Sequence, residues 1–433
     1  MCSSDLSRIH PAAASPAAQP RLRIAMVTES YPPEINGVAN SVARVVQGLR
    51  AREHAVQLVR PRQRDEAPTG GRGDIDEILT AGMQIPLYEH LRMGLPARER
   101  LTRAWTTRRP DIVHIATEGP LGWSALQAAR ALGLPVCSDF RTNFHAYSRF
   151  YRLGWLQRPI MGYLRAFHNR CHCTMVPTET LQLELANAGL RSLNVVARGV
   201  DTVLFAPAKR STALRAQWGV DNDTLVVLHV GRLAPEKNLG VVMQAFDSIR
   251  NTKPQARLVI VGDGPSRTEL QTRHPHAIFA GFRAGEDLAA HYASSDMFLF
   301  ASLTETYGNV TPEAMASGLA VVAYDDAAAG QLIRHGIDGL LARKGDHADF
   351  LVCATDLSAN RQWRQAMGLA ACARVADLGW DSILGKIERI YTGTIRHVNG
   401  AAVWSLAGSA TAADTTQAAQ RHARATGKRA TVS

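Results

Sequence analysis

Two glutamates, Glu305 and Glu313, stand eight residues apart on either side of a short loop. That loop contains Gly308 and Asn309, which readily adopt the backbone angles of tight turns. Carboxylates accept hydrogen bonds from hydroxyl groups, and free backbone N–H groups at the start of a helix bind phosphate. The spacing therefore predicts a pocket for a ligand in which sugar hydroxyls flank a phosphate.

The flanking elements are expected to hold this loop at one edge of a sheet. The apolar run 297–300 is typical of a buried parallel strand. After the loop, Thr311 is expected to cap a helix, with Pro312 at its first position and Glu313 in its first turn. Strand, loop and helix N-terminus in this order present backbone N–H groups to an anion.

A second strand end carries two cations. Arg232 and Lys237 follow the apolar segment 225–230, which is predicted to be a buried strand. Ligands of open α/β sheets bind at the carboxyl ends of strands, where this loop lies. Arginine donates paired hydrogen bonds to phosphate oxygens, and lysine adds a point charge. The two side chains could therefore stabilise the charge on a leaving diphosphate without a metal ion.

A third loop, at residues 28–37, repeats the pattern near the N-terminus. It follows a predicted strand at 23–27 and precedes apolar residues at helical spacing. Asn36 and Gly37 are expected to cap that helix, and Gly37 leaves its backbone N–H accessible. An ordinary capped helix without a ligand also explains this loop when it is taken alone.

Motifs for metals and common nucleotide folds are incomplete. Residues 168–173 include two histidines and two cysteines but lack a second ligand pair at a recognisable spacing. Asp74 and Asp76 match a short metal signature but lie in a polar loop. The Gly-x-Gly at 262–264 lacks the third glycine of the dinucleotide fingerprint, and no Walker A sequence is present. We therefore expect no metal site and no P-loop chemistry.

Length and composition favour a two-domain protein of a reducing compartment. A chain of 433 residues exceeds one ordinary core. No apolar run approaches the ~18–20 residues of a membrane span, and the N-terminus lacks the hydrophobic segment of a signal peptide. Six cysteines without regular spacing do not suggest a disulfide framework. We expect a cytoplasmic protein, with peripheral binding to the inner membrane as an open alternative.

The net charge of +11 is concentrated in the first half, where residues 1–200 contain 25 arginines, no lysine and 16 acidic residues. A basic half fits a phospholipid surface, a nucleic acid or a phosphorylated acceptor, but a biased genome composition also explains it. The predicted helix 96–105 carries Arg98, Arg100 and Arg103. It is either an amphipathic helix on an anionic membrane or a crossover helix with solvated charges.

Strands and helices alternate along most of the chain, which is typical of doubly wound parallel sheets in the α/β class. The compositions of the two ends are typical of disorder. The predicted parts are a disordered N-terminus at 1–20, a first domain at 21–200, a linker at 201–208, a second domain at 209–375, a helical segment at 376–397 and a disordered tail at 398–433.

Three motifs, in order on two sheets, resemble those of the retaining glycosyltransferases of family 4. They are Pro32-Pro33 with Gly37, Gly231-Arg232 with Lys237, and the segment from Glu305 to Glu313. The resemblance spans about residues 22–395. Segments 176–179 and 197–201 also resemble the branch that contains lipid- and polysaccharide-directed mannosyl- and glucosyltransferases.

The resemblance implies a GT-B fold, with two Rossmann-like domains facing a central cleft. The first domain would bind a lipid or glycan acceptor and the second an NDP-sugar, while the segment 376–397 would cross back to the first domain. No nucleic acid and no cofactor or metal would be required besides the donor, a GDP- or UDP-sugar. The implied reaction is hexose transfer with retention, in which the leaving phosphate accepts the proton of the acceptor.

Residue roles follow from the same resemblance. Arg232 and Lys237 would hold the diphosphate, Glu313 the ribose hydroxyls and Glu305 the transferred hexose. Backbone groups of the loop would approach the hexose and phosphate, and a glycine of the first domain would contact phosphate from the opposite side. The residues with these backbone roles are Gly308, Asn309, Val310 and Gly37.

One position departs from the family pattern. Arg141 stands where a histidine that lines the sugar site is expected, and His145 follows four residues later. Either His145 takes that role, or Arg141 binds phosphate of the donor or acceptor. The sequence selects neither the base, the hexose nor the acceptor, and two other functions stay open. These are a nucleotide-sugar epimerase of the same fold and a non-catalytic subunit that binds NDP-sugars.

Overall fold

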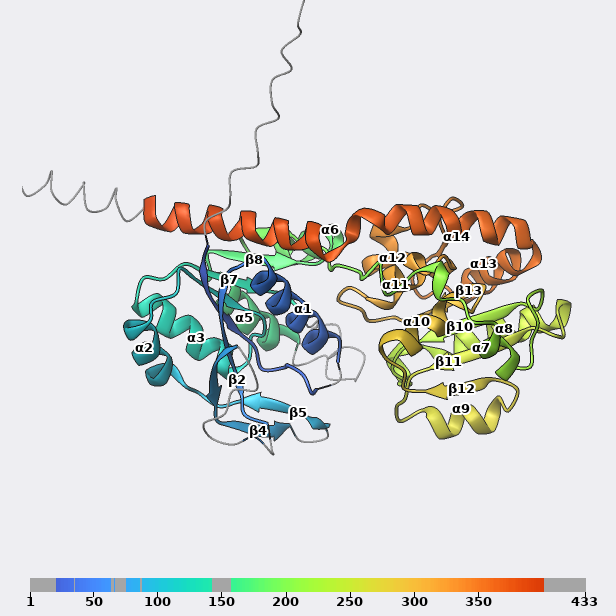
Figure 1. The fold of residues 1–433 in the computed structure, drawn as a ribbon, viewed down its shortest axis with the longest axis horizontal. Helices are drawn as coiled ribbons and strands as arrows, with labels where there is room; N and C mark the ends of the chain where they lie inside the picture. Colours follow the sequence, from blue (N-terminus) through green and yellow to red (C-terminus); the bar gives the residue numbers. More distant parts are fainter. Residues whose placement is uncertain are drawn as a thin grey trace, which may run out of the picture.

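The computed structural model describes residues 21–34, 36–63, 66, 75–85, 88–141 and 157–400. Within these ranges, two parallel sheets with helices on both faces lie side by side (Figure 1). This architecture confirms the predicted α/β class and the GT-B arrangement of two Rossmann-like units.

The first sheet has the strand order β3-β2-β1-β6-β7-β8-β9 among the described residues, and all its pairs are parallel. Its strands are β1 Arg23–Val27, β2 Ala55–Pro61, β3 Asp76–Thr80, β6 Ile112–Ile115, β7 Val136–Asp139, β8 Cys173–Val176 and β9 Leu193–Val195. A separate antiparallel pair comprises β4 Gly82–Ile85 and β5 Tyr88–Gly94. The helices are α1 Gly37–Ala51, α2 Arg98–Thr107, α3 Pro120–Ala131, α5 Gln157–His168 and α6 Glu179–Asn187.

Alternate side chains of β1 point to opposite faces of this sheet, as the strand period of two requires. Ile24 and Met26 pack with α1, while Ala25 and Val27 pack with α2 and α3. Both faces are covered, so the strands are apolar throughout.

The second sheet has the order β12-β11-β10-β13-β14-β15 and is also parallel within the described residues. Its strands are β10 Val226–Val230, β11 Arg257–Val261, β12 Ile278–Gly281, β13 Met297–Phe300, β14 Ala320–Tyr324 and β15 Leu340–Ala342. The helices are α7 Thr212–Gln217, α8 Leu239–Thr252, α9 Arg267–Arg273, α10 Gly285–Ala293, α11 Val310–Ala316, α12 Ala327–Leu332, α13 His347–Ala359 and α14 Arg361–Val375.

The strand order reverses direction once in each sheet, between β1 and β6 and between β10 and β13. Crevices at such switch points are where open α/β sheets bind ligands. The loop after β1 leads to Gly37, the loop after β10 carries Arg232, and the loop after β13 carries Glu305. The topology therefore places all three predicted motifs at switch points.

A helix over residues 380–400 leaves the second domain and packs along the first (Figure 1, red). Its Glu388 carboxylate lies 2.9 Å from Nε2 of His54 and 3.3 Å from Arg52. Leu384 is buried against Gly48 of α1, where any added side chain would collide with it. This helix is therefore part of the first domain's core.

The chain passes between the domains twice, and the two passages touch. The backbone N–H of Val200 donates to the carbonyl of Leu378 at 3.0 Å, and Val200 bridges Gly379. A Cβ added at Gly199 would lie 2.6 Å from the Trp380 ring. The passages thus form one hydrogen-bonded unit where the domains meet.

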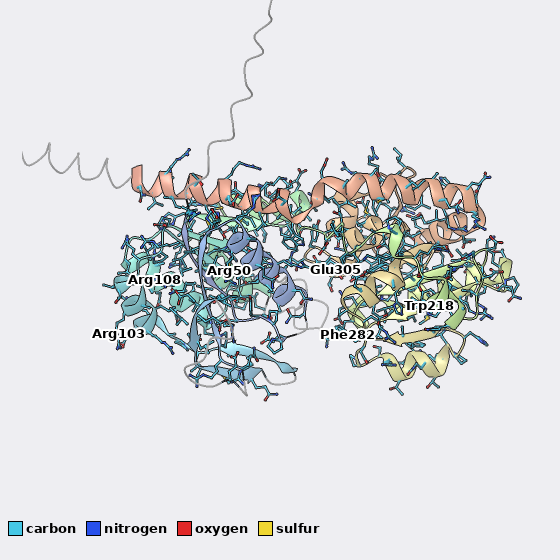
Figure 2. All side chains as sticks on the ribbon, viewed as in Figure 1. Arg50, Arg103, Arg108, Trp218, Phe282 and Glu305 are labelled. Atoms are coloured by element: carbon cyan, nitrogen blue, oxygen red, sulfur yellow. The ribbon has the colours of Figure 1, made fainter. Side chains whose placement is uncertain are left out.

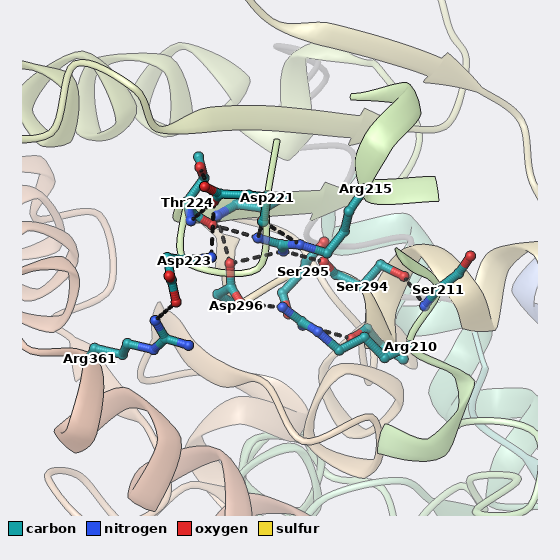
Figure 3. A network of polar contacts seen from close by, with 12 residues as sticks. Arg210, Ser211, Arg215, Asp221, Asp223, Thr224, Ser294, Ser295, Asp296 and Arg361 are labelled. Carbon is teal, nitrogen blue, oxygen red and sulfur yellow. Dashed lines mark hydrogen bonds and ion pairs between the residues drawn. The ribbon is translucent and has the colours of Figure 1, made fainter. Parts of the chain in front are cut away.

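A buried arginine anchors the amino end of the second sheet (Figure 3). Arg215 is 1% exposed and donates to the carbonyls of Asp221, Thr224 and Ser294. Its guanidinium also lies 3.2 Å from Asp296, whose carboxylate accepts from the Val226 N–H at 2.8 Å. The network satisfies the charge of Arg215 and fixes the start of β10.

Several elements differ from the sequence prediction. The short strands β3, β4, β5, β9 and β15 were not predicted, because each lies at a sheet edge or outside the main sheets and lacks a long apolar run. The predicted cap at Thr311 is wrong, since α11 begins at Val310 after Asn309, and Thr311 is buried within the helix. Asn36 does cap α1, accepting from the Ala39 N–H at 2.8 Å.

Candidate active site

Glu305 and Lys237 form an ion pair between the loops that follow β13 and β10. Their side chains are only 15% and 14% exposed, so the pair is largely shielded from water. The Ser302 hydroxyl donates to the same Glu305 oxygen at 2.8 Å. Figure 2 shows Glu305 on the side of the second domain that is nearer to the first. Among the described residues, the second carboxylate oxygen of Glu305 has no hydrogen-bond partner, so it can accept hydrogen bonds from a ligand.

Arg232 lies in the same loop as Lys237 but is half exposed, with its guanidinium 3.9 Å from Glu236. The Gly-x-Gly segment after β11 supports this loop by close backbone contact. Side chains at Gly262 and Gly264 would collide with the carbonyls of Gly231 and Leu233. These glycines therefore serve close packing of two loops, which explains a Gly-x-Gly without the remainder of a dinucleotide fingerprint.

Glu313 occupies the first turn of α11 and does not contact Glu305 through any hydrogen bond among the described residues. Its Oε2 accepts from the Tyr292 hydroxyl at 3.0 Å. Burial raises the pKa of Glu313 from 4.5 to about 7, although the Tyr292 bond opposes that rise. The carboxyl therefore titrates near neutral pH in the folded protein.

The loop between the two glutamates approaches the first domain. Gly308 has φ +86°, a left-handed conformation that favours glycine, and Asn309 follows it. A Cβ at Gly37 would lie 3.7 Å from Nδ2 of Asn309, so the start of α1 faces the start of α11. Val310 is partly buried against the core. The structure thus brings Gly37, Gly308 and Asn309 together from two domains.

Arg141 lies two residues after the end of β7, and its side chain is 8% exposed. It donates through Nε to Asp139 at 2.7 Å and through another nitrogen to the Ser41 hydroxyl. Nε2 of His114 lies 3.0 Å from the same Asp139 oxygen. Burial opposes ionisation of Asp139, but Arg141 and His114 outweigh it and hold its pKa well below its usual range. His145 lies outside the described residues.

The Asp139 group continues into the helix over 380–400. Nδ1 of His114 lies 2.5 Å from the hydroxyl of Tyr391, which is fully buried. Tyr391 thus links the crossing helix to the position of Arg141 through His114 and Asp139. Sequence reasoning missed these partners and Tyr292, because contacts between elements far apart in the sequence carry no local pattern. It also missed Ser302, which lies three positions before Glu305 in the same loop.

Metal-ligand patterns have other roles where the structure describes them. Nδ1 of His172 accepts from the Val136 N–H at 3.0 Å, and Cys171 is buried at the end of α5. No group of three or more His, Cys, Asp or Glu side chains within the described ranges could hold a metal ion. A separate search of the same residues found no helix long and apolar enough to span a membrane.

Comparisons with known proteins identify the family. Residues 35–204 match the family described as "Glycosyltransferase Family 4", and residues 224–360 match "Glycosyl transferases group 1". A GDP-mannose-dependent alpha-mannosyltransferase of Corynebacterium glutamicum is 34% identical over 86% of this chain and 89% of its own length. An alpha-monoglucosyldiacylglycerol synthase of Acholeplasma laidlawii is 26% identical over 75% and 86%, respectively.

The fold has close structural counterparts. Sucrose-phosphate synthase from Thermosynechococcus elongatus superposes with a TM-score of 0.72 over 86% of this chain and 99% of its own, at 18% identity. The family matches, the sequence relatives and the fold together define a glycosyltransferase. The chain belongs to glycosyltransferase family 4 and is a hexosyltransferase of GT-B fold. Membership of this family favours a glycosyltransferase over the two alternatives, a nucleotide-sugar epimerase and a non-catalytic subunit that binds NDP-sugars.

Proposed function

We propose that this chain transfers mannose, with retention, from GDP-mannose to a lipid or glycan acceptor. The observation that carries the proposal is the Lys237–Glu305 pair at the switch point of the second sheet. A diphosphate would form ion pairs with Lys237 and Arg232. Glu305, no longer paired with Lys237, would accept hydrogen bonds from hexose hydroxyls. The choice of GDP-mannose rests on the 34% identical relatives that are named for that donor.

The remaining groups fit the other parts of a nucleotide sugar. Glu313 would accept from the ribose hydroxyls, and the backbone around Gly308, Asn309 and Val310 would approach the hexose and phosphate. Gly37 would contact phosphate from the first domain, since a Cβ built on it would lie 3.7 Å from Nδ2 of Asn309. His145 or Arg141 would line the sugar site. Cations suffice here to neutralise the leaving diphosphate, so we propose that neither a metal ion nor a cofactor takes part.

In the proposed reaction, the acceptor hydroxyl oxygen forms the new bond to the anomeric carbon as the carbon–phosphate oxygen bond breaks. The departing phosphate oxygen takes the hydroxyl proton on the same face of the sugar, so the anomeric configuration is retained. Arg232 and Lys237 stabilise the charge on that leaving group. Glu305 orients the hexose so that both events occur on one face.

The test is to incubate the purified chain with labelled GDP-mannose or UDP-glucose, with a chelator present. We expect mannose transfer to membrane lipid extracts or glycans, with α-configured product by NMR. Binding of both donors without transfer or hydrolysis of either would contradict the enzyme. Transfer from UDP-glucose alone would overturn the choice of donor, and loss of transfer with chelator would overturn metal independence.

We further propose peripheral contact with an anionic membrane through arginines on and after α2. Arg98, Arg100, Arg103, Arg108 and Arg109 are exposed, whereas Leu101 and Trp105 of the same helix are buried in the core. Figure 2 shows Arg103 and Arg108 on the part of the first domain that lies away from Glu305. Anionic vesicles should sediment the wild type, whereas charge reversal at Arg98, Arg100 and Arg103 should abolish sedimentation. Equal sedimentation of both proteins would refute the contact.

A further inference from the structure

Two guanidinium groups converge on one hydroxyl near the junction of the domains. Arg141 donates to the Ser41 Oγ, and Arg198 Nη1 lies 3.5 Å from the same atom. The Ser41 hydroxyl in turn donates to the Val38 carbonyl at 3.1 Å. Serine carries no charge, so it cannot compensate two cations that are held this close.

Among the residues that the structure describes, only one of the two arginines has a carboxylate partner. Asp139 forms an ion pair with Arg141, contacting its Nε and Nη2, and also lies beside Nε2 of His114. Within the described residues, Arg198 makes no ion pair, and the nearby Asp201 is taken by Arg44 at 3.0 Å. Burial, followed by the charge of Arg141, lowers the pKa of Arg198 to about 10. The cluster thus keeps one uncompensated positive charge in a partly buried place.

The position of this charge relates it to the reaction. The Tyr307 hydroxyl donates to the Arg198 carbonyl at 3.3 Å, and Tyr307 is two residues from Glu305. An open pocket beside the cluster is lined by Ser41, Asp139, Arg141 and Arg198, with apolar side chains from the helix over 380–400. A ligand in that pocket would lie on the first domain and next to the loop of Glu305.

We propose that Arg198, Ser41 and Arg141 bind an anionic group, a carboxylate or phosphate ester, carried by the acceptor near its attacking hydroxyl. One anion would balance the single excess charge, and arginine pairs bind such planar or tetrahedral oxyanions well. The donor diphosphate is the other source of an anion. However, Arg232 and Lys237 of the second domain would already neutralise it, and the first domain would add only the backbone of Gly37, whereas this cluster adds a positive charge on the first domain. The inference rests on the proposed function, because it takes the first domain as the acceptor side.

A binding measurement tests the site without relying on turnover. The full chain is saturated with GDP, which fills the donor phosphate site, and its unfolding midpoint is followed with inorganic phosphate at constant ionic strength. We expect phosphate to raise the midpoint of the wild type and of Arg273→Met, an exposed arginine control. The rise should vanish in Arg198→Met and be partly kept in Arg198→Lys. A rise that persists in Arg198→Met, or that GDP eliminates, would overturn the site.

Kinetics separate the acceptor from the donor as the source of the anion. Octyl glucoside, octyl glucuronide and octyl glucoside 6-phosphate are compared as acceptors with GDP-mannose. We expect Arg198→Met to lower kcat/KM by about tenfold or more for the charged acceptors and by much less for the neutral one. Equal loss on all three acceptors, with a raised KM for GDP-mannose, would assign Arg198 to the donor. Mannose transfer to the neutral acceptor and GDP binding report separately on the proposed function.

Discussion

The ammonium of Lys237 and the carboxylate of Glu305 neutralise each other across the ends of β10 and β13. Both groups belong to the proposed reaction, and neither faces water as a lone charge before substrate binds. A donor that brings a diphosphate and sugar hydroxyls supplies each of them with a new partner. Substrate binding would therefore exchange one ion pair for two sets of contacts, at a small net electrostatic cost.

Replacement of Glu305 by alanine should remove the hexose contact and leave the nucleotide contacts. We expect labelled mannose transfer to fall by about a hundredfold or more, since orientation of the sugar is lost. GDP affinity, measured by calorimetry, should stay close to that of the wild type. Ser302→Ala, which removes one hydrogen bond to Glu305, should give a smaller loss. If Glu305→Ala turned over normally, the assignment would be wrong.

Lys237→Met should destabilise the protein because it leaves the Glu305 carboxylate without its cation in a largely buried place. We expect a loss of about 2 kcal/mol in the free energy of unfolding, measured with urea. The double variant Lys237→Met with Glu305→Gln should recover much of that loss, since the unpaired charge is then absent. If the loss in the double variant equalled the sum of the losses in Lys237→Met and Glu305→Gln, the two side chains would not be energetically coupled.

Glu313 should make stability and nucleotide binding depend on pH. Its folded pKa of about 7 exceeds the ordinary 4.5, so the folded state holds the proton more tightly than the unfolded state. Below pH 4.5 both states are protonated and no penalty exists; between 4.5 and 7 stability falls, and above 7 the penalty is complete. The unfolding midpoint of the wild type should therefore fall relative to Glu313→Gln across that window.

The same titration should appear in GDP binding. In the proposed site the ionised carboxyl would accept from both ribose hydroxyls, so GDP affinity of the wild type should rise as pH increases towards and through 7. Glu313→Gln should bind GDP about tenfold more weakly above pH 7 and show little dependence on pH. Parallel pH profiles of the two proteins would remove Glu313 from the nucleotide site.

Asp139→Asn should be among the most destabilising single changes in the first domain. It removes the negative charge that compensates Arg141 and contacts His114, all within a buried cluster. We expect a loss of about 3 kcal/mol or more in the free energy of unfolding. Tyr391→Phe, which removes only the hydroxyl near His114, should cost about 1 kcal/mol. Similar values for both variants would show that the charge of Asp139 is not what matters.

Local patterns predicted the parts of the fold that depend on local chemistry. The apolar runs gave β1, β10 and β13, and Asn36 with Gly37 correctly placed the start of α1. The order Thr311, Pro312, Glu313 predicts a cap at Thr311, with proline at the first helical position. Yet Asn309 precedes the helix without a side-chain cap bond, and Thr311 is buried inside it. Packing can thus determine where a short helix begins, even where the local sequence indicates a different cap.

The pairing of functional groups could not be predicted in the same way. Lys237 and Glu305 are far apart in sequence and meet only because β10 and β13 are neighbours at the switch point. Arg141 was singled out as a departure from the family, but its neutralisation by Asp139 depends on the geometry after β7. Arg198 lies in the segment 197–201 that carries part of the family resemblance, but nothing in the sequence assigns it a role. That it lacks a carboxylate partner among the described residues depends on the three-dimensional arrangement.

The double passage near Val200 and Gly379 has a consequence for dissection of the molecule. In topological terms, the second domain is an insertion, because the first domain begins at β1 and is completed only by the helix over 380–400. A fragment cut once at the linker would lack Tyr391 and Leu384 and expose part of its core. Independent folding of the first domain would require that helix to be supplied again, as a fused or separate peptide.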